Sequence, residues 1–139
     1  MLNQYLTNIY MLRNNIYNLH FNIKGEGSSG FHEKLNYDIE EVNKFYDSLA
    51  ELIKKIGGYP IMNLEEIKMI STIKEISSKD YTKKEAENLL LNDLTVINSM
   101  NKQVGEYALK NYDLMSINLV LDFDKYLQKR IWLLEMNKN

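Results

Sequence analysis

The sequence predicts an all-α protein, a four-helix bundle with one long crossover connection. The only proline among the 139 residues is Pro60, so little interrupts helix formation. Apolar residues recur every three or four positions along four long segments. The stretch between the second and third segments carries a short helical pattern of its own, which favours a connection that crosses the bundle. No internal repeat or linker divides the chain, so we expect one domain over residues 1–139.

The first helix is predicted over about residues 3–24, because apolar side chains recur there at helical spacing. The glycine- and serine-rich stretch over residues 25–30 should end it. The positions expected to face the core are Leu2, Leu6, Ile9, Ile16, Leu19 and Ile23.

The second helix is predicted from about Phe31 to Ile56. Gly57 and Gly58 followed by Pro60 form a strong stop, because glycine adopts the left-handed cap and proline cannot continue a helix. The positions expected to face the core are Leu35, Ile39, Val42, Leu49, Leu52 and Ile56.

Capping patterns locate the remaining helices. Residues 63–66, Asn-Leu-Glu-Glu, resemble a capping box and should open a short helix to about Ile70. The Thr82 to Glu85 stretch is a better capping box, opening a third long helix to about Lys110. Asp113 can cap a fourth helix that ends near Met136. Trp132 and the methionines at helical spacing are expected in the core.

Composition excludes several classes of function. The net charge is −2 and the pI about 5.7, which argues against a nucleic-acid binder that works through bulk charge. The chain has no cysteine, so disulfides and thiolate metal sites are excluded. No apolar signal segment or membrane-spanning stretch is evident, so we expect a cytoplasmic protein without a membrane partner.

The side chains that suggest chemistry are two histidines and two carboxylates. His20 and His32, the only histidines, lie twelve residues apart on either side of the glycine-rich stretch. Asp47 and Glu51 lie one helical turn apart further along the second helix. Histidine and carboxylate together are ligands of iron, zinc and manganese. Taken alone, each histidine also fits an ordinary core or surface position, and the carboxylates fit a solvated helix face.

The spacing on the second helix requires any such site to be shared. His32 and Asp47 are fifteen residues apart, which is roughly 22 Å at about 1.5 Å rise per residue. Two copies of this helix packed antiparallel about a two-fold axis near residues 41–42 would bring His32 of one chain opposite Asp47 and Glu51 of the other. A two-fold interface is self-complementary, so it would carry two sites. The turn between the first two helices lets His20 return alongside His32.

These residues resemble the Dps family of mini-ferritins, the DNA-binding proteins from starved cells. The spacing of the two histidines and the downstream Asp47 and Glu51 is the specific part of the resemblance. Supporting segments cover nearly the whole chain: residues 18–25 (NLHFNIKG), 31–34 (FHEK), 46–47 (YD), 57–60 (GGYP), 71–75 (STIKE) and 129–134 (KRIWLL).

The resemblance implies a ferritin-like four-helix subunit assembled as a hollow homo-oligomer, a dodecamer in this family. It implies oxidation of Fe²⁺ to Fe³⁺, commonly with hydrogen peroxide, and storage of a ferric mineral that protects against oxidative stress. His20 and His32 match ligands from one subunit, and Asp47 and Glu51 match those from its partner. A conventional ferritin centre inside one bundle is disfavoured, because the chain has no Glu-x-x-His.

Three features depart from the family pattern. Asn36 occupies the position of a usual aspartate one turn after His32, and it offers a neutral, weaker oxygen ligand or is simply a satisfied polar group. Phe21 replaces a common tryptophan. The lysine-rich N-terminal arm of DNA-binding members is missing, so DNA is an improbable partner. Two alternatives to the iron-oxidising function therefore remain: a cage that binds metal passively, and a module that coats DNA.

A set of aspartates allows a further interpretation. Asp113, Asp122 and Asp124 could line an acidic entry pore for Fe²⁺ at a three-fold axis. Alternatively, Asp113 caps the last helix and the other two are exposed carboxylates.

Overall fold

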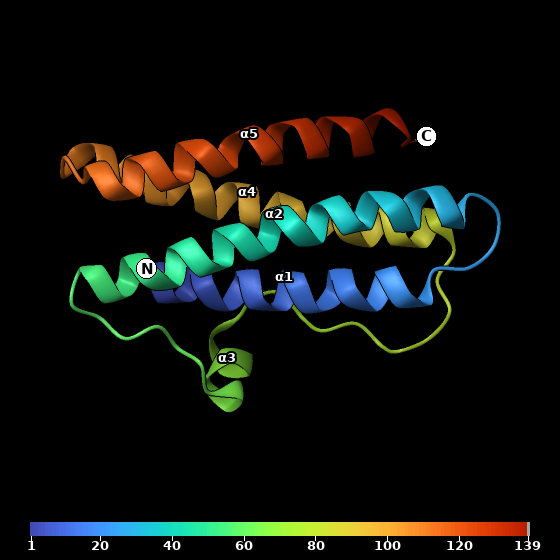
Figure 1. The fold of residues 1–139 in the computed structure, drawn as a ribbon, viewed down its shortest axis with the longest axis horizontal. Helices are drawn as coiled ribbons and strands as arrows, with labels where there is room; N and C mark the ends of the chain where they lie inside the picture. Colours follow the sequence, from blue (N-terminus) through green and yellow to red (C-terminus); the bar gives the residue numbers. More distant parts are fainter. Residues whose placement is uncertain (139) are drawn as a thin grey trace.

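The computed structural model describes residues 1–138 and contains five helices. Their bounds are α1 (Leu2–Asn22), α2 (Ser28–Lys55), α3 (Leu64–Ile70), α4 (Lys83–Lys110) and α5 (Leu114–Met136). The four long helices run side by side along the longest axis of the molecule (Figure 1). None of these helices is long and apolar enough to cross a membrane. The predicted all-α class and the order of the helices are confirmed.

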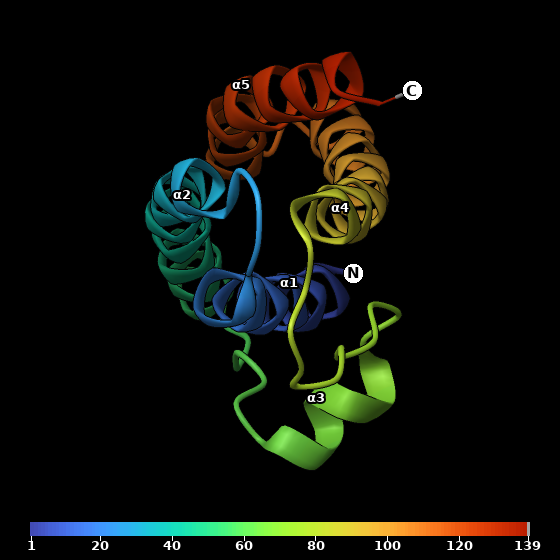
Figure 2. The same cartoon turned by 90° about the vertical axis from the view of Figure 1, so that its right-hand side faces the viewer.

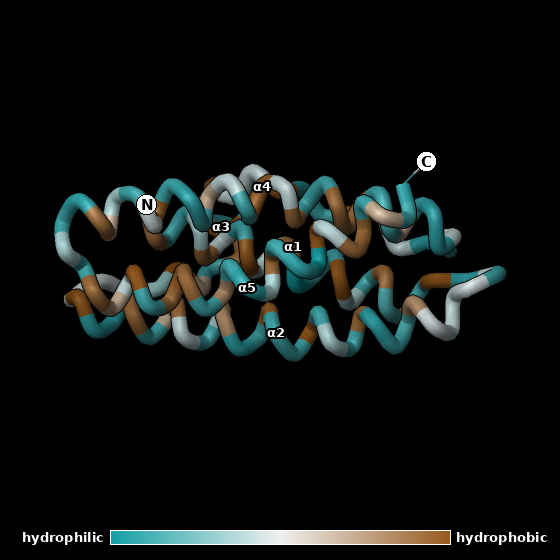
Figure 3. Tube along the Cα trace, turned by 90° about the horizontal axis from the view of Figure 1, so that it is seen from above, coloured by the Kyte–Doolittle hydropathy of each residue, from teal (hydrophilic) through white to brown (hydrophobic). Residues whose placement is uncertain are grey.

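The long helices form a closed bundle around one core. Helix α1 packs against α2 and α4, and α5 packs against the same two helices from the other side (Figure 2). The crossover between α2 and α4 carries α3, which packs on the outside of α1. Hydrophobic residues recur between hydrophilic ones along every long helix (Figure 3), as expected for helices with one buried face. The predicted crossover bundle is therefore the observed fold.

Side-chain caps begin three of the helices where the sequence predicts them. Thr82 and Glu85 form a reciprocal capping box at α4, in which each side chain accepts a hydrogen bond from the other residue's backbone N–H. The Asn63 side chain accepts from the N–H of Glu66 at α3, and the Asp113 side chain accepts from that of Ser116 at α5. Helix α2 begins at Ser28, three residues before the predicted start, and no side chain caps it.

The crossover is fixed to α1 by asparagine side chains. The Asn8 Oδ1 accepts hydrogen bonds from the Ser71 hydroxyl at 2.7 Å and from the backbone N–H groups of Thr72 at 2.8 Å and Ile73 at 3.0 Å. Asn15 bonds the same connection further along, donating to one backbone carbonyl and accepting from one N–H. These bonds satisfy polar backbone groups of an irregular segment that covers the apolar flank of α1.

A buried ion pair joins α2 to α5. Arg130 Nε donates to both carboxylate oxygens of Asp38, at 2.8 and 3.1 Å, and Nη2 donates to one of them at 3.0 Å. The Tyr126 hydroxyl donates to the same carboxylate at 2.6 Å. Burial raises the pKa of Asp38, while the bonds and charge of Arg130 and the bond from Tyr126 act in the opposite direction. This pair fixes the register of the two helices.

Some expected core positions are wrong. Ile56 is 51% exposed because α2 ends at Lys55, beyond the part of the bundle that could cover it. Trp132 is 62% exposed, since the core-facing side of α5 carries Arg130 and Leu134 instead. Among the methionines, Met11 is buried and Met100 packs partly buried against the core, but the other five are exposed: Met1, Met62, Met69, Met115 and Met136.

Candidate metal centre

His20 and His32 lie together at one end of the bundle. His20 is in the last turn of α1 and His32 is in the second turn of α2. The chain reverses between them through Gly25 and Gly27, whose φ angles of 97° and 78° favour glycine. The two imidazole rings are stacked, with centroids 3.8 Å apart and planes inclined by 18°. The turn therefore places two potential imidazole ligands side by side.

A backbone carbonyl orients the His32 ring. Its Nδ1 lies 2.7 Å from the carbonyl oxygen of His20, so Nδ1 carries the hydrogen and donates. The lone pair of the neutral ring then resides on Nε2. Proteins usually fix the tautomer of a metal-binding histidine by such a hydrogen bond from the ring nitrogen that does not bind the metal. His32 is therefore held in a form whose Nε2 can bind a cation.

His20 is buried, and its Nδ1 makes no hydrogen bond within residues 1–138. Burial lowers the pKa of His20, and the neighbouring His32 lowers it further because two adjacent imidazolium rings repel each other. Both effects favour the neutral ring, which is the form that binds metals. Phe21 is 72% exposed in the single chain, and its ring is in a T-shaped arrangement with that of His20, with centroids 5.1 Å apart.

Asp47 and Glu51 lie on the exposed surface of α2, toward its other end. The structure does not bring them to the histidines of the same chain: fifteen residues of continuous helix, roughly 22 Å, separate Asp47 from His32. Within residues 1–138 no group of three or more histidines and carboxylates could hold a metal ion. Asn36, one turn after His32, is exposed. The candidate ligands therefore lie in two separate groups, the histidines where α1 and α2 meet and the carboxylates toward the other end of α2.

The aspartates considered for an entry pore do not gather around one point of the single chain. The Asp113 carboxylate caps α5 and also accepts from the Ser116 hydroxyl at 2.6 Å, which confirms its capping role. Asp124 accepts from the Gln128 side chain, and Asp122 is exposed. A role at a three-fold axis stays a prediction.

The sequence pattern does not predict one buried charged pair, formed by Asp38 and Arg130. Both residues are charged, which favours a surface position, but each occupies a core-facing position between apolar neighbours at helical spacing. The signal in the sequence is this spacing: Asp38 lies three positions after the buried Leu35, and Arg130 lies four positions before the buried Leu134.

Comparison with known proteins agrees with this architecture. Residues 1–137 match the family model described as Ferritin-like domain. A DNA protection during starvation protein of Helicobacter pylori is 28% identical over 120 residues, which are 86% of this chain and 83% of the relative. The protein of the same name from Brevibacillus brevis is 27% identical over 135 residues, covering 97% and 90% of the two chains.

Solved structures show the same fold. A Dps protein from Bacillus brevis superposes with a TM-score of 0.89 at 27% identity, over 97% of this chain and 90% of that one. The antigen TpF1 of Treponema pallidum gives a TM-score of 0.95 at 24% identity, over 99% and 89% of the two chains. The family match over nearly the whole chain, the Dps relatives and the crossover bundle lead to one conclusion. The chain belongs to the ferritin-like family and is a Dps-type mini-ferritin.

Proposed function

We propose that this protein oxidises Fe²⁺ with hydrogen peroxide at sites shared between two subunits and stores the ferric product, protecting against oxidative stress. The observation that supports the proposal best is the division of potential ligands along α2. Stacked His20 and His32 lie at one end, and exposed Asp47 and Glu51 lie at the other. Neither half can hold iron firmly alone, but two antiparallel copies complete each other.

The register of such a pair follows from simple geometry. For a two-fold axis between residues 41 and 42, the numbers of facing residues add to 83. His32 then faces Glu51 of the second copy, and Asn36 faces Asp47. All of these side chains except His32, which is half-buried, are exposed in the single chain and free to meet a second copy. We therefore propose a closed homo-oligomer, a dodecamer by analogy with the family, with two iron sites in each two-fold interface.

The donor set suits ferrous iron. Neutral imidazole nitrogen and anionic carboxylate oxygen are ligands of non-haem iron. The buried Nδ1 of His20 has no hydrogen-bond partner within residues 1–138, which also favours a ligand near this ring. The reaction balances when two Fe²⁺ each give one electron to one peroxide, which takes up two protons and leaves as two waters. Glu51 can contact two cations at once, which would hold both electron donors close to the oxidant. Because the peroxide receives two electrons rather than one, no hydroxyl radical is released.

A second function is favoured by one observation. Asn36 places a neutral amide where the family carries an aspartate, and its side chain is exposed one turn from His32. An amide cannot balance the charge of a cation, so iron could be held too weakly for efficient oxidation. In that case the protein would be a cage that binds iron or zinc passively.

Assembly is tested first by sedimentation of the wild-type protein. A large closed oligomer is the expected result, because the ligands of each site come from two chains. A stable monomer under native conditions would exclude both the cage and the shared site.

Ligand substitutions test the chemistry. His20→Ala with His32→Ala, and separately Asp47→Ala with Glu51→Ala, should each abolish fast peroxide-dependent oxidation of Fe²⁺ in a stopped-flow experiment. Glu106→Ala, which removes an exposed carboxylate on α4, serves as the matched control and should oxidise iron at the wild-type rate. Sedimentation of every variant separates loss of chemistry from loss of the shell.

Mixed oligomers separate a shared site from two independent ones. Co-assembly of histidine-deficient with carboxylate-deficient chains should restore part of the activity, because some interfaces regain one complete site. No recovery, in shells shown to contain both chains, would contradict the shared site. Metal binding without oxidation in the wild-type protein would support the passive cage.

A further inference from the structure

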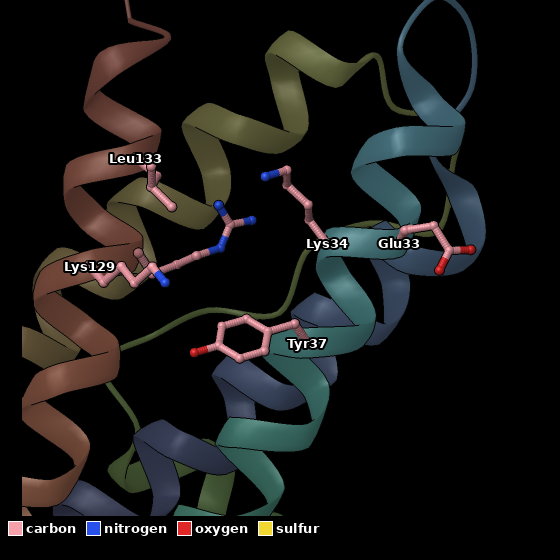
Figure 4. Close-up of a pocket in the computed structure, with 6 residues that line it drawn as sticks. Glu33, Lys34, Tyr37, Lys129 and Leu133 are labelled. Atoms are coloured by element: carbon pink, nitrogen blue, oxygen red, sulfur yellow. The ribbon is translucent and has the colours of Figure 1, made fainter.

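A second site of different chemistry lies between α2 and α5, on the side of the bundle near the chain's C-terminal end. A cavity of about 370 Å³ is lined there by Glu33, Lys34, Tyr37, Lys129, Arg130 and Leu133. Lys34 and Tyr37 point from α2 into the gap toward α5, whereas Glu33 points to the opposite side (Figure 4). A neighbouring cavity of about 440 Å³ shares Lys34, Arg130 and Leu133 with it. The two cavities are therefore adjacent, and together they are called the hollow.

The lysines of this hollow lack partners. Lys34, Lys129 and Lys83 form no ion pair or side-chain hydrogen bond within residues 1–138. Elsewhere on the described chain, exposed lysines such as Lys24 and Lys44 do pair with acidic side chains. Three unpaired ammonium groups around one hollow give it a positive potential, which favours an anion.

Arg130 adds a donor that is held in a fixed position. Its side chain is 5% exposed, and the bonds to Asp38 use only Nε and Nη2. Nη1 therefore retains two N–H donors without an acceptor in the described structure, on the guanidinium that lines both cavities. Asp38 holds the guanidinium in place, so this free edge is preorganised for an incoming oxygen.

The N-terminal end of α2 also favours an anion in this hollow. Gly27 and Gly30 line the second cavity, and no side chain caps this 28-residue helix. The first N–H groups of a helix and its dipole favour a negative charge at that end. The Lys83 side chain packs over Gly27, where an added Cβ would lie 2.8 Å from its Cδ. Glu87, the one carboxylate of the second cavity, accepts a hydrogen bond from the Asn137 side chain.

We propose that this hollow binds a phosphate-sized oxyanion, with Lys34, Lys129 and the free edge of Arg130 as its ligands. Guanidinium and ammonium groups surrounding one point match the several oxygens of a phosphate group. The walls supplied by Tyr37 and Leu133 leave room for an organic substituent, so the phosphate can be free or carried by a small molecule such as a mononucleotide. The proposal does not depend on iron chemistry.

Calorimetric titration tests the site on the assembled protein without added iron. Inorganic phosphate is titrated at constant ionic strength, with chloride as the compensating salt. The wild type should give saturable binding, and Lys34→Gln with Lys129→Gln should weaken it on the order of tenfold or more. Lys102→Gln with Lys110→Gln removes the same charge from two exposed lysines at the other end of α4 from Lys83 and is the matched control, expected to bind like the wild type.

A parallel titration with AMP identifies the source of the phosphate. Equal affinities for AMP and inorganic phosphate would support a site for the free oxyanion, whereas tighter AMP binding that is lost in the same double variant would support a phosphorylated small molecule. Absence of saturable binding in the wild type would overturn the proposal. So would equal weakening in the cavity variant and the control variant, because that result reports net charge alone.

Discussion

Asp93 on α4 carries a charge that the folded chain disfavours. Burial raises the pKa of this carboxyl from 3.8 to about 6, although the Asn15 side chain donates a hydrogen bond to it at 3.0 Å. A carboxyl with a raised pKa binds its proton more tightly in the folded chain than in the unfolded chain. Its contribution to stability is therefore greatest below pH 4 and is lost as the pH rises through about 6.

Asp93→Asn removes this charge and keeps an acceptor for Asn15 in nearly the same shape. A shift of about two pKa units corresponds to about 3 kcal/mol at 1.36 kcal/mol per unit. Because Asp93 is only half-buried, solvent reduces that value, and we expect a gain of about 1–2 kcal/mol in the free energy of unfolding at pH 8. At pH 4, where the wild-type carboxyl is largely protonated in the folded chain, the two proteins should be nearly equal in stability.

Urea unfolding followed by circular dichroism from pH 4 to pH 8 measures this difference. The protein concentration must be fixed, since assembly makes the apparent stability depend on it. Asp80→Asn is the control, because Asp80 is exposed and its ion pair with Lys24 spans 3.7 Å at the surface; it should change stability by less than about 1 kcal/mol. The reasoning fails if Asp93→Asn gives no gain at pH 8, or gives the same gain at pH 4.

Three further predictions concern the buried pair, the departure at Asn36, and DNA. Asp38→Ala leaves Arg130 buried without its counterion and should lower the free energy of unfolding by about 3 kcal/mol or more, as read from urea unfolding; a loss below about 1 kcal/mol would contradict the structural role of the pair. Asn36→Asp should tighten Fe²⁺ binding and speed peroxide-dependent oxidation by roughly tenfold, because a charged oxygen worth on the order of 1–3 kcal/mol replaces a neutral one. Stopped-flow measurement at equal iron loading checks it, and an unchanged or slower rate would mean that Asn36 does not approach the metal. With a net charge of −2, micromolar protein should not retard DNA in a gel at physiological salt without added divalent metal; clear retardation would favour the DNA-coating alternative.

The sequence predicted the fold well because the decisive signals are local. Helical periodicity and caps such as Thr82 report on residues a few positions apart, and they located the long helices to within about three residues. Failures came where the answer depends on distant packing. Trp132 has helical spacing like its buried neighbours, but which side of α5 faces the core is decided by α2 and α4. The burial of Arg130 was not predicted, because a charged residue usually indicates a position on the surface.

The candidate site was predictable only in halves. The pairing of His20 with His32 follows from a short turn, and the spacing of Asp47 and Glu51 follows from one helix, so both halves are visible in the sequence. Joining them, as proposed above, would require a contact between chains, which no pattern within one chain records. The Asn36 position shows the same limit, since its effect would depend on what faces it in the proposed two-fold pair.

The distance between the two halves on α2 has a genetic consequence if the shared site is correct. Each chain would lend its histidines to one site and its carboxylates to another, so a defect in one half would spoil only one of the two sites that the chain serves. In a cell that makes both normal and altered chains, a defect of one kind would lower activity in proportion to its dosage. A chain carrying both defects would inactivate both sites to which it contributes, so the loss of activity would exceed the fraction of altered chains. Two alleles, each defective in a different half, would partly complement each other within the same shell.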